Sequence, residues 1–257
     1  MKSELDKFYT KSSVAIRCIS TLDLSIYDQV IEPSAGNGSF SHNISHDNLL
    51  ALDLLPEDDT ITQMNWFDYI PNLNYNKVLV IGNPPFGIRN TLSRGFITHS
   101  IYMFNVVTIA FILPNVFLKH TNQKIFPSNW RLKSIISIED NAFLLDNIPY
   151  HVPCSFFVWD KSEGEDLRFN PELYTSCDDF EFCDKRSADY YITGAAPHLL
   201  KDPNNIIPRG YYIRALDISK EELKHKFESI KWLGHSSVSG GNFWLTKPEI
   251  IKTYLGG

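Results

Sequence analysis

Asn83, Pro84, Pro85 and Phe86 follow directly on an apolar run with the composition of a buried strand. Proline removes a backbone donor and fixes φ, so the tetrapeptide ends the strand and stiffens the chain there. An amide oxygen and a fixed backbone carbonyl can each accept an N–H from an exocyclic amine, which would turn its lone pair toward an electrophile. Phe86 offers a face on which a base can stack. The tetrapeptide therefore predicts chemistry on an amino group.

A second motif, Glu32 to Phe40, has the composition of a ligand-binding turn. Gly36 and Gly38 would let a ligand approach the backbone closely, although an ordinary strand-to-helix turn also fits. The spacing lacks the third glycine of a dinucleotide fingerprint, and an acid before the turn suits a ligand with a positive amino group. Asp53 closes the next apolar run, where an acid accepts hydrogen bonds from a ribose diol or caps the strand.

These residues require a sheet that brings the ends of successive strands together. Nearly continuous apolar runs alternate with helical stretches, which is typical of a parallel sheet covered on both faces. The apolar period from Val14 to Leu22 predicts an amphipathic helix, and a further helix is expected after Gly38. One strand is expected to end near Ile31 and another, the longest apolar run, at Pro114. Four further strands are expected within the runs 48–55, 77–82, 132–140 and 152–160.

From Lys161 the sequence becomes polar and rich in turn signals. We expect residues 1–160 to form a catalytic core and residues 161–257 a C-terminal extension with substrate-recognition elements packed on it. Two stretches of the extension, 209–218 and 234–245, combine Arg, aromatic and Gly residues suited to a nucleic-acid edge. A solvated lobe with core aromatics explains both stretches equally well.

The composition narrows the class of protein. The chain has 257 residues, 43% of them apolar, and a net charge of −6. This charge argues against a generic polycation that coats nucleic acid, but it leaves room for a local basic groove. Six cations could form a rim that contacts phosphates, or simply an ordinary solvated face: Arg89, Arg94, Lys119, Lys124, Arg131 and Lys133.

The cysteines and the apolar runs indicate the compartment. Four cysteines are too few and too scattered for a disulfide framework, and no His or Cys cluster has the spacing of a metal site. We therefore expect reduced thiols, no metal and an intracellular location. No secretory signal opens the chain and no run of about 18 apolar residues occurs, so no membrane partner is expected.

The order of motifs resembles a known family. Phe8-Tyr9-Thr10, the Glu32 turn, Asp53 and the Asn83 turn are similar to those of the class I S-adenosylmethionine-dependent methyltransferases that act on amino groups. Within these, the chain looks like the N6-adenine nucleic-acid methyltransferases over residues 6–160. The resemblance implies a Rossmann-like α/β fold, with a mainly parallel seven-stranded sheet and helices on both faces, and a cofactor-binding catalytic core.

The resemblance also implies roles for individual positions. Glu32 would hold the amino group of S-adenosylmethionine, and Asp53 its ribose. Asn65 stands where the family often has an acid at the cofactor's adenine, but an amide can still accept from an exocyclic amine. Ten positions would line the cofactor: Phe8, Tyr9, Thr10, Glu32, Ser34, Gly36, Gly38, Asp53, Asn65 and Trp66.

The catalytic set implied by the resemblance is Asn83, Pro84, Pro85 and Phe86. Asn83 and Pro84 would bind the target amine and Phe86 would stack on its base. Tyr150 would stack on the other face of the base, or simply cover the core as a loop tyrosine.

The expected reaction is methyl transfer to N6 of adenine in DNA, because compact chains with this motif order resemble stand-alone, viral or phage DNA-modifying enzymes. RNA, including ribosomal or cap-proximal adenine, is the alternative substrate. Protein glutamine methylation and a catalytically silent cofactor-binding subunit are further alternatives. The chain would act as a monomer or with a partner that supplies basic surface. A Pro-Cys pair ending at Cys154 matches the nucleophile of cytosine C5 methyltransferases, but its apolar surroundings predict a buried structural thiol.

Overall fold

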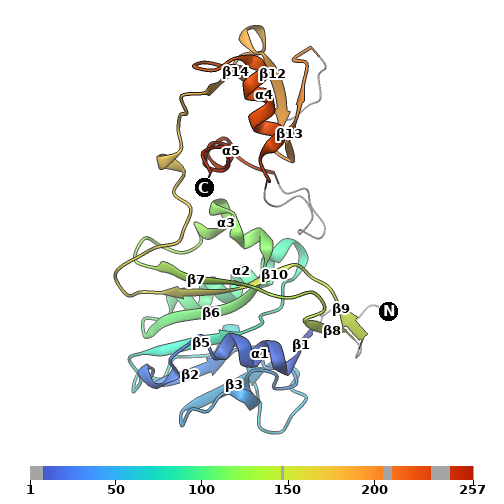
Figure 1. Cartoon of the computed structure of the whole chain (residues 1–257). Helices are drawn as coiled ribbons and strands as arrows, with labels where there is room; N and C mark the ends of the chain where they lie inside the picture. The colour runs from blue at the N-terminus through green and yellow to red at the C-terminus, as the bar shows by residue number, and fades with distance from the viewer. Residues whose placement is uncertain (1–7, 146–147, 205–209, 233–243, 257) are drawn as a thin grey trace. The chain divides into compact units, whose positions relative to one another are not determined.

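The computed structural model describes residues 8–145, 148–204, 210–232 and 244–256. The chain divides into two compact units, Met1–Arg168 and Phe169–Gly257 (Figure 1). The first unit contains every residue that the sequence assigned to cofactor and target amine.

The first unit is built on a seven-stranded sheet with the order β4-β3-β2-β5-β6-β10-β7 (Figure 1). β10 is antiparallel to both of its neighbours, β6 and β7, whereas the other pairs are parallel. This arrangement confirms the expected Rossmann-like α/β fold. The strands are β2 (Gln29–Glu32), β3 (Leu49–Asp53), β4 (Thr62–Gln63), β5 (Val78–Gly82), β6 (Val106–Pro114), β7 (Arg131–Ser137) and β10 (Cys154–Asp160).

Both faces of the inner strands β2, β5, β6 and β10 are buried, which explains why these strands read as continuous apolar runs. On one face, Ile81 and its neighbours pack against Val14 and Cys18 of α1 (Ser12–Ile19). On the other face, Val80 and its neighbours pack against Phe96 of α2 (Thr91–Tyr102). The predicted amphipathic helix and the strand ending at Pro114 are thus both present.

The prediction of a helix after the glycine turn is wrong. Only a short 3-10 helix, Ser41–Asn43, lies between β2 and β3. The segment before it is rich in Gly, Asn and Ser, which are poor helix formers because they lose much backbone freedom or compete with the backbone for hydrogen bonds. The Asn43 amide does compete in this way, since it donates to the Ser39 carbonyl at 2.9 Å. The remaining short helices of this unit are α3 (His120–Gln123) and the 3-10 helices Leu24–Ile26, Trp66–Asp68, Ile88–Asn90 and Asn115–Leu118.

A small antiparallel sheet joins the N-terminal segment to a hairpin that precedes β10. Its order is β1-β8-β9, with Tyr9 opposite Leu144 and Phe143 opposite Tyr150. Segments far apart in the sequence are thereby brought to one place. The strands are β1 (Tyr9–Thr10), β8 (Phe143–Leu145) and β9 (Ile148–Tyr150).

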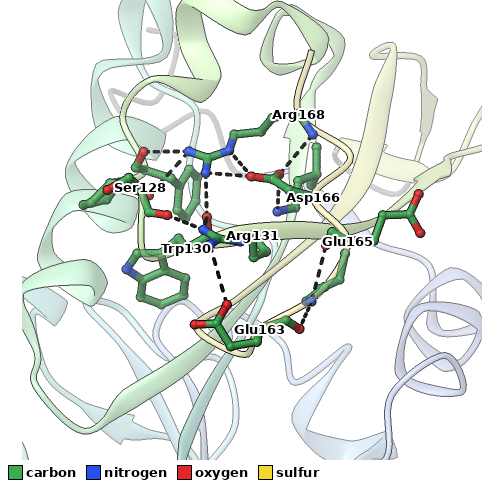
Figure 2. Close-up of polar contacts among 11 residues, drawn as sticks. Ser128, Trp130, Arg131, Glu163, Glu165, Asp166 and Arg168 are labelled. Atoms are coloured by element: carbon green, nitrogen blue, oxygen red, sulfur yellow. Dashed lines mark hydrogen bonds and ion pairs between the residues drawn. The ribbon is translucent and has the colours of Figure 1, made fainter. Parts of the chain in front are cut away.

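Residues 161–168 belong to the first unit, although the sequence placed them in the extension. Figure 2 shows the contacts that hold them. The Arg168 guanidinium donates to the Trp130 carbonyl at 2.7 Å and to the Phe126 carbonyl at 3.1 Å. Asp166 accepts from the Leu132 amide at 3.1 Å and pairs with Arg168 at 2.7 Å. Although partial burial alone would raise the pKa of Asp166, hydrogen bonds from Arg168 and Leu132 outweigh it and lower that pKa.

The second unit has its own sheet and core. Four antiparallel strands in the order β11-β14-β12-β13 share a buried apolar cluster with two helices. Phe180, Ile213 and Phe227 are at the centre of that cluster. Arg209 and residues 234–243, from the two stretches suggested for nucleic-acid contact, lie outside the described residues. The elements are β11 (Phe180–Cys183), β12 (Tyr190–Thr193), β13 (Ala196–Lys201), β14 (Tyr211–Ala215), α4 (Lys220–Ser229), α5 (Lys247–Tyr254) and the 3-10 helices Pro171–Leu173 and Lys185–Ser187.

Three of the sequence expectations concern the cysteines, metal ligands and membrane-spanning segments. All four cysteines have free thiols. Among the described residues, no three or more His, Cys, Asp and Glu side chains gather as metal ligands would. In the same part of the chain, every helix is too short or too polar to cross a bilayer.

Arg168→Ala should destabilise the first unit by about 1–3 kcal/mol, because the carbonyls of Phe126 and Trp130 lose their donor and Asp166 loses its partner. Thermal unfolding followed by circular dichroism would measure the change. Arg17→Ala is the matched control, since Arg17 is half-exposed and pairs with Glu139 at the surface. Equal and small shifts for the two variants would contradict a structural role for the Arg168 contacts.

Candidate active site

A cavity lies where β2, β3 and β5 end, at the edge of the sheet where Rossmann-like folds bind their ligands. Its wall combines the N-terminal segment, the glycine turn, the end of β3 and the Asn83 turn. The lining residues are Phe8, Tyr9, Thr10, Glu32, Pro33, Ser34, Ala35, Gly36, Asn37, Ser39, Phe40, Asp53, Leu54, Leu55, Asn65, Trp66, Phe67, Asn83, Pro85, Leu92 and Phe96.

The side-chain amide of Asn83 donates a hydrogen bond through its nitrogen, whereas its oxygen accepts none from the part of the chain that the structure describes. The Nδ2 group donates to Thr10 Oγ1 at 3.1 Å, whereas Oδ1 is buried and accepts from no described residue. Leaving a buried acceptor unpaired costs about 1–3 kcal/mol, so such an atom at a cavity marks the place of a missing donor. The backbone carbonyl of Asn83 accepts from the Ser34 hydroxyl at 3.4 Å, which ties the turn to the glycine motif.

Glu32 is a buried acid, only 2% exposed, at the end of β2. Burial raises its pKa from 4.5 to about 7; the nearby Asp53 charge adds to the rise, and hydrogen bonds from Ser41 and Phe40 oppose it. The Ser41 amide donates to Glu32 Oε2 at 2.8 Å. A carboxyl group in this state gains its charge readily when a cation arrives beside it.

Asp53 and Tyr9 fix the glycine turn on two sides. Asp53 accepts from the Gly36 amide and from the Leu55 amide, each at 2.8 Å, so it caps the strand end while facing the cavity. Gly36 has φ +55°, and a Cβ there would come within 3.2 Å of the Tyr9 ring. The Tyr9 hydroxyl donates to Glu57.

Gly38 does not line the cavity, contrary to its predicted role. It has φ +83°, and a Cβ would lie 2.4 Å from the His42 ring, so it serves the turn instead. The turn is closed by the Gly38 amide, which donates to the Ala35 carbonyl at 2.8 Å.

The apolar end of the cavity contains residues that the sequence analysis missed. Asn65 caps the 3-10 helix after β4 by accepting from the Phe67 amide at 3.2 Å. The Trp66 ring is 1% exposed and stacks on Tyr69, so it belongs to the core as much as to the cavity wall. Five further apolar side chains of the lining escaped notice because isolated apolar residues carry no motif: Leu54, Leu55, Phe67, Leu92 and Phe96.

The aromatic residues that were predicted to stack on the target base are arranged differently from the expectation. Phe8 stacks on Tyr150, with ring centroids 4.7 Å apart and planes at 12°, and lies 6.3 Å from Phe86. Phe8 thus covers one face of Tyr150, the ring that was predicted to stack on a base. Neither Phe86 nor Tyr150 lines the cavity, and Pro84 is buried beside it.

Cys154 cannot act as a nucleophile from its position. It is 1% exposed in β10, and burial raises the pKa of its thiol well above the ordinary value. The thiolate is the reactive form, so the structural interpretation of Cys154 is confirmed.

Three solved structures resemble the fold. The 23S rRNA methyltransferase ErmE is 12% identical with a TM-score of 0.48, and the match covers 65% of this chain and 75% of ErmE. The putative RNA methyltransferase PH1948 from Pyrococcus horikoshii is 14% identical with a TM-score of 0.45, covering 62% of this chain and 89% of PH1948. TrmN from Thermus thermophilus is 14% identical with a TM-score of 0.38, covering 59% of this chain and 48% of TrmN.

No family model matches the chain, and no curated protein matches its sequence. At such low identities and TM-scores, the three structures carry no functional assignment. The site itself must supply the argument for function.

Glu32→Gln should flatten the pH dependence of stability. Because the pKa of Glu32 is raised in the folded state, the free energy of unfolding falls as pH rises from 4.5 to about 7. The loss is about 3 kcal/mol for a shift of this size, and Gln, which cannot ionise, should not incur it. Urea unfolding between about pH 5 and pH 8 would measure both profiles.

The half-exposed Glu139 provides the control, and Glu139→Gln should keep the wild-type profile. The same pH dependence in Glu32→Gln and wild-type protein would show that Glu32 ionises without penalty.

Proposed function

We propose that this chain transfers a methyl group from S-adenosylmethionine to N6 of an adenine in nucleic acid. One observation carries the proposal: the buried Asn83 Oδ1 has no partner while Asn83 Nδ2 is held by Thr10. The amide is therefore fixed with its acceptor reserved for a donor that comes from outside the described chain. An exocyclic amine, which has two N–H groups, is such a donor.

The cavity fits S-adenosylmethionine in its polar and apolar parts. The cofactor's ammonium would lie near Glu32, whose raised pKa means that binding a cation also releases a proton. Its ribose hydroxyls would reach Asp53, whose carboxylate oxygens have spare lone pairs beyond the two amides that they accept. Its adenine would lie among Leu54, Phe67 and Phe96.

The chemistry asks little of the protein beyond placement. The cofactor would supply an electrophilic methyl group bonded to a sulfonium sulfur. When the methyl group is transferred, the sulfur is the leaving group and becomes a neutral thioether. Accepting one N–H at Asn83 Oδ1 turns the nitrogen lone pair toward that methyl carbon, and the proton lost after transfer passes to water. Positioning of this kind accounts for much of the rate that enzymes achieve in group transfer.

DNA is the first polymer to test, because the order of motifs resembles that of compact DNA-modifying enzymes, and RNA is the second. A second candidate function, methylation of a protein glutamine, rests on the same Asn83 oxygen, since a glutamine side chain also presents an NH₂ group. Labelled cofactor offered with DNA, RNA and protein separates these substrates by where the label appears. Analysis of the modified nucleosides then identifies the methylated atom.

Asn83→Ala should lower methyl transfer by about 100-fold or more, because the target amine loses its acceptor. The Kd of S-adenosylmethionine, measured by isothermal titration, should change little, since the proposal assigns Asn83 Oδ1 to the target amine and not to the cofactor. Turnover at the wild-type rate would refute the proposal. Cofactor binding without transfer to any polymer by the wild-type chain would favour a silent binding subunit.

Thr10→Val should lower kcat by about 10-fold while leaving the Kd of the cofactor nearly unchanged, because the Asn83 amide is then free to rotate. Thr10→Ser is the matched control, since it retains the hydroxyl that holds Asn83 Nδ2 and should keep most of the activity. Equal losses in both variants would indicate that the Thr10 methyl group matters rather than its hydrogen bond.

A further inference from the structure

Acidic residues are absent from a long segment that contains the Asn83 turn. Residues 69–138 contain seven Lys or Arg and no Asp or Glu, in a chain whose net charge is −6. This segment forms β5, the Asn83 turn, α2, β6, α3 and β7. One stretch of the fold is therefore strongly cationic although the whole chain is acidic.

Five of these seven cations fall into two groups in the structure. Arg131 and Lys133 are engaged by residues 163–165, since Arg131 pairs with Glu163 at 3.8 Å and Lys133 donates to the Glu163 carbonyl at 2.9 Å (Figure 2). They are not available to a ligand in this arrangement.

The second group of cations forms no ion pair with the described residues, and one side-chain hydrogen bond, from Arg94, links these side chains to them. Among the ion pairs of the described residues, none involves Arg89, Arg94 or Lys124, which we name the basic rim. Arg94 donates to Asn122 Oδ1 at 3.2 Å, which brings the first turn of α2 against α3, and Lys124 follows α3 directly. Arg89 lies on the loop between Phe86 and α2. The basic rim therefore begins beside the Asn83 turn and continues over α2 and α3.

A groove follows one face of α2 from the basic rim. Arg94, Thr98 and Tyr102 recur every four residues along that face, and Ile125 also lines the groove. Phe67 lines both this groove and the cofactor cavity, so the two are neighbours. The complete lining is Phe67, Arg94, Gly95, Thr98, His99, Tyr102 and Ile125.

The groove combines a cation with an exposed aromatic ring. Tyr102 is 82% exposed, which leaves its ring free to stack. The acid nearest along the chain is Asp68, whose charge acts on His99, so the Arg94 end carries the positive character. A cationic groove with aromatic platforms is the arrangement by which proteins bind a nucleic-acid strand without reading its sequence.

We propose that the basic rim and the α2 groove bind the strand that flanks the target adenine. Arg89, Arg94 and Lys124 contact its phosphates, and Tyr102 stacks on a neighbouring base. This inference rests on the proposed function for the nature of the polymer, but binding can be measured without methyl transfer. Failure of one is therefore distinguishable from failure of the other.

The first test is the salt dependence of binding to a fluorescein-labelled DNA duplex, from about 50 to 200 mM salt. Each lost phosphate contact lowers the slope of log Kd against log salt by about 0.9, so replacing all three rim residues by Gln should lower it by about 2–3. The control removes the same charge from cations with partners of their own: Arg17→Gln, Arg131→Gln and Lys133→Gln. An unchanged slope for the rim variant, or an equal fall for the control, would overturn the inference.

The second test separates stacking from charge. Tyr102→Ala should weaken binding of the duplex, or of an RNA strand of the same sequence, by about five-fold or more. Phe104→Ala is the control, since Phe104 is 64% exposed and two residues away but does not line the groove. Equal effects of the two variants would remove Tyr102 from the proposed surface. Whichever probe shows the larger effect identifies the polymer that the groove accepts.

Discussion

The hydrogen bond between Thr10 and Asn83 connects the parts of the site. Thr10 belongs to β1, which pairs with β8, and Asn83 follows the last residue of β5. The bond engages an N–H of the Asn83 side chain, while Oδ1 has no partner among the described residues. The Ser34 hydroxyl adds a contact from the glycine turn to the same residue. The N-terminal segment, the glycine turn and the Asn83 turn therefore share one fixed point.

Burial gives the site its electrostatic character. Glu32 is desolvated at the end of β2, whereas Asp53 is held by two backbone amides at the end of β3. Two neighbouring acids thus have different environments: one is costly to ionise until a cation binds, and the other is already surrounded by donors. A zwitterionic ligand with a sugar would use both.

The sheet needs little α-helix to build this site. A 3-10 helix and hydrogen-bonded turns connect β2 to β3, yet the strand ends still meet at one edge. α2 covers one face and, on its outer side, carries the groove and part of the basic rim.

The sequence by itself determined the strand runs, the α/β class and most of the cavity wall, because buried parallel strands and rigid turns leave strong local signals. Only the tertiary structure decided that Gly38 packs on His42, that Phe8 covers Tyr150, and that residues 161–168 belong to the first unit. It also decided which cations are engaged and which are open. These outcomes depend on contacts between distant segments, and residue types along the chain carry no record of which distant partner each side chain meets.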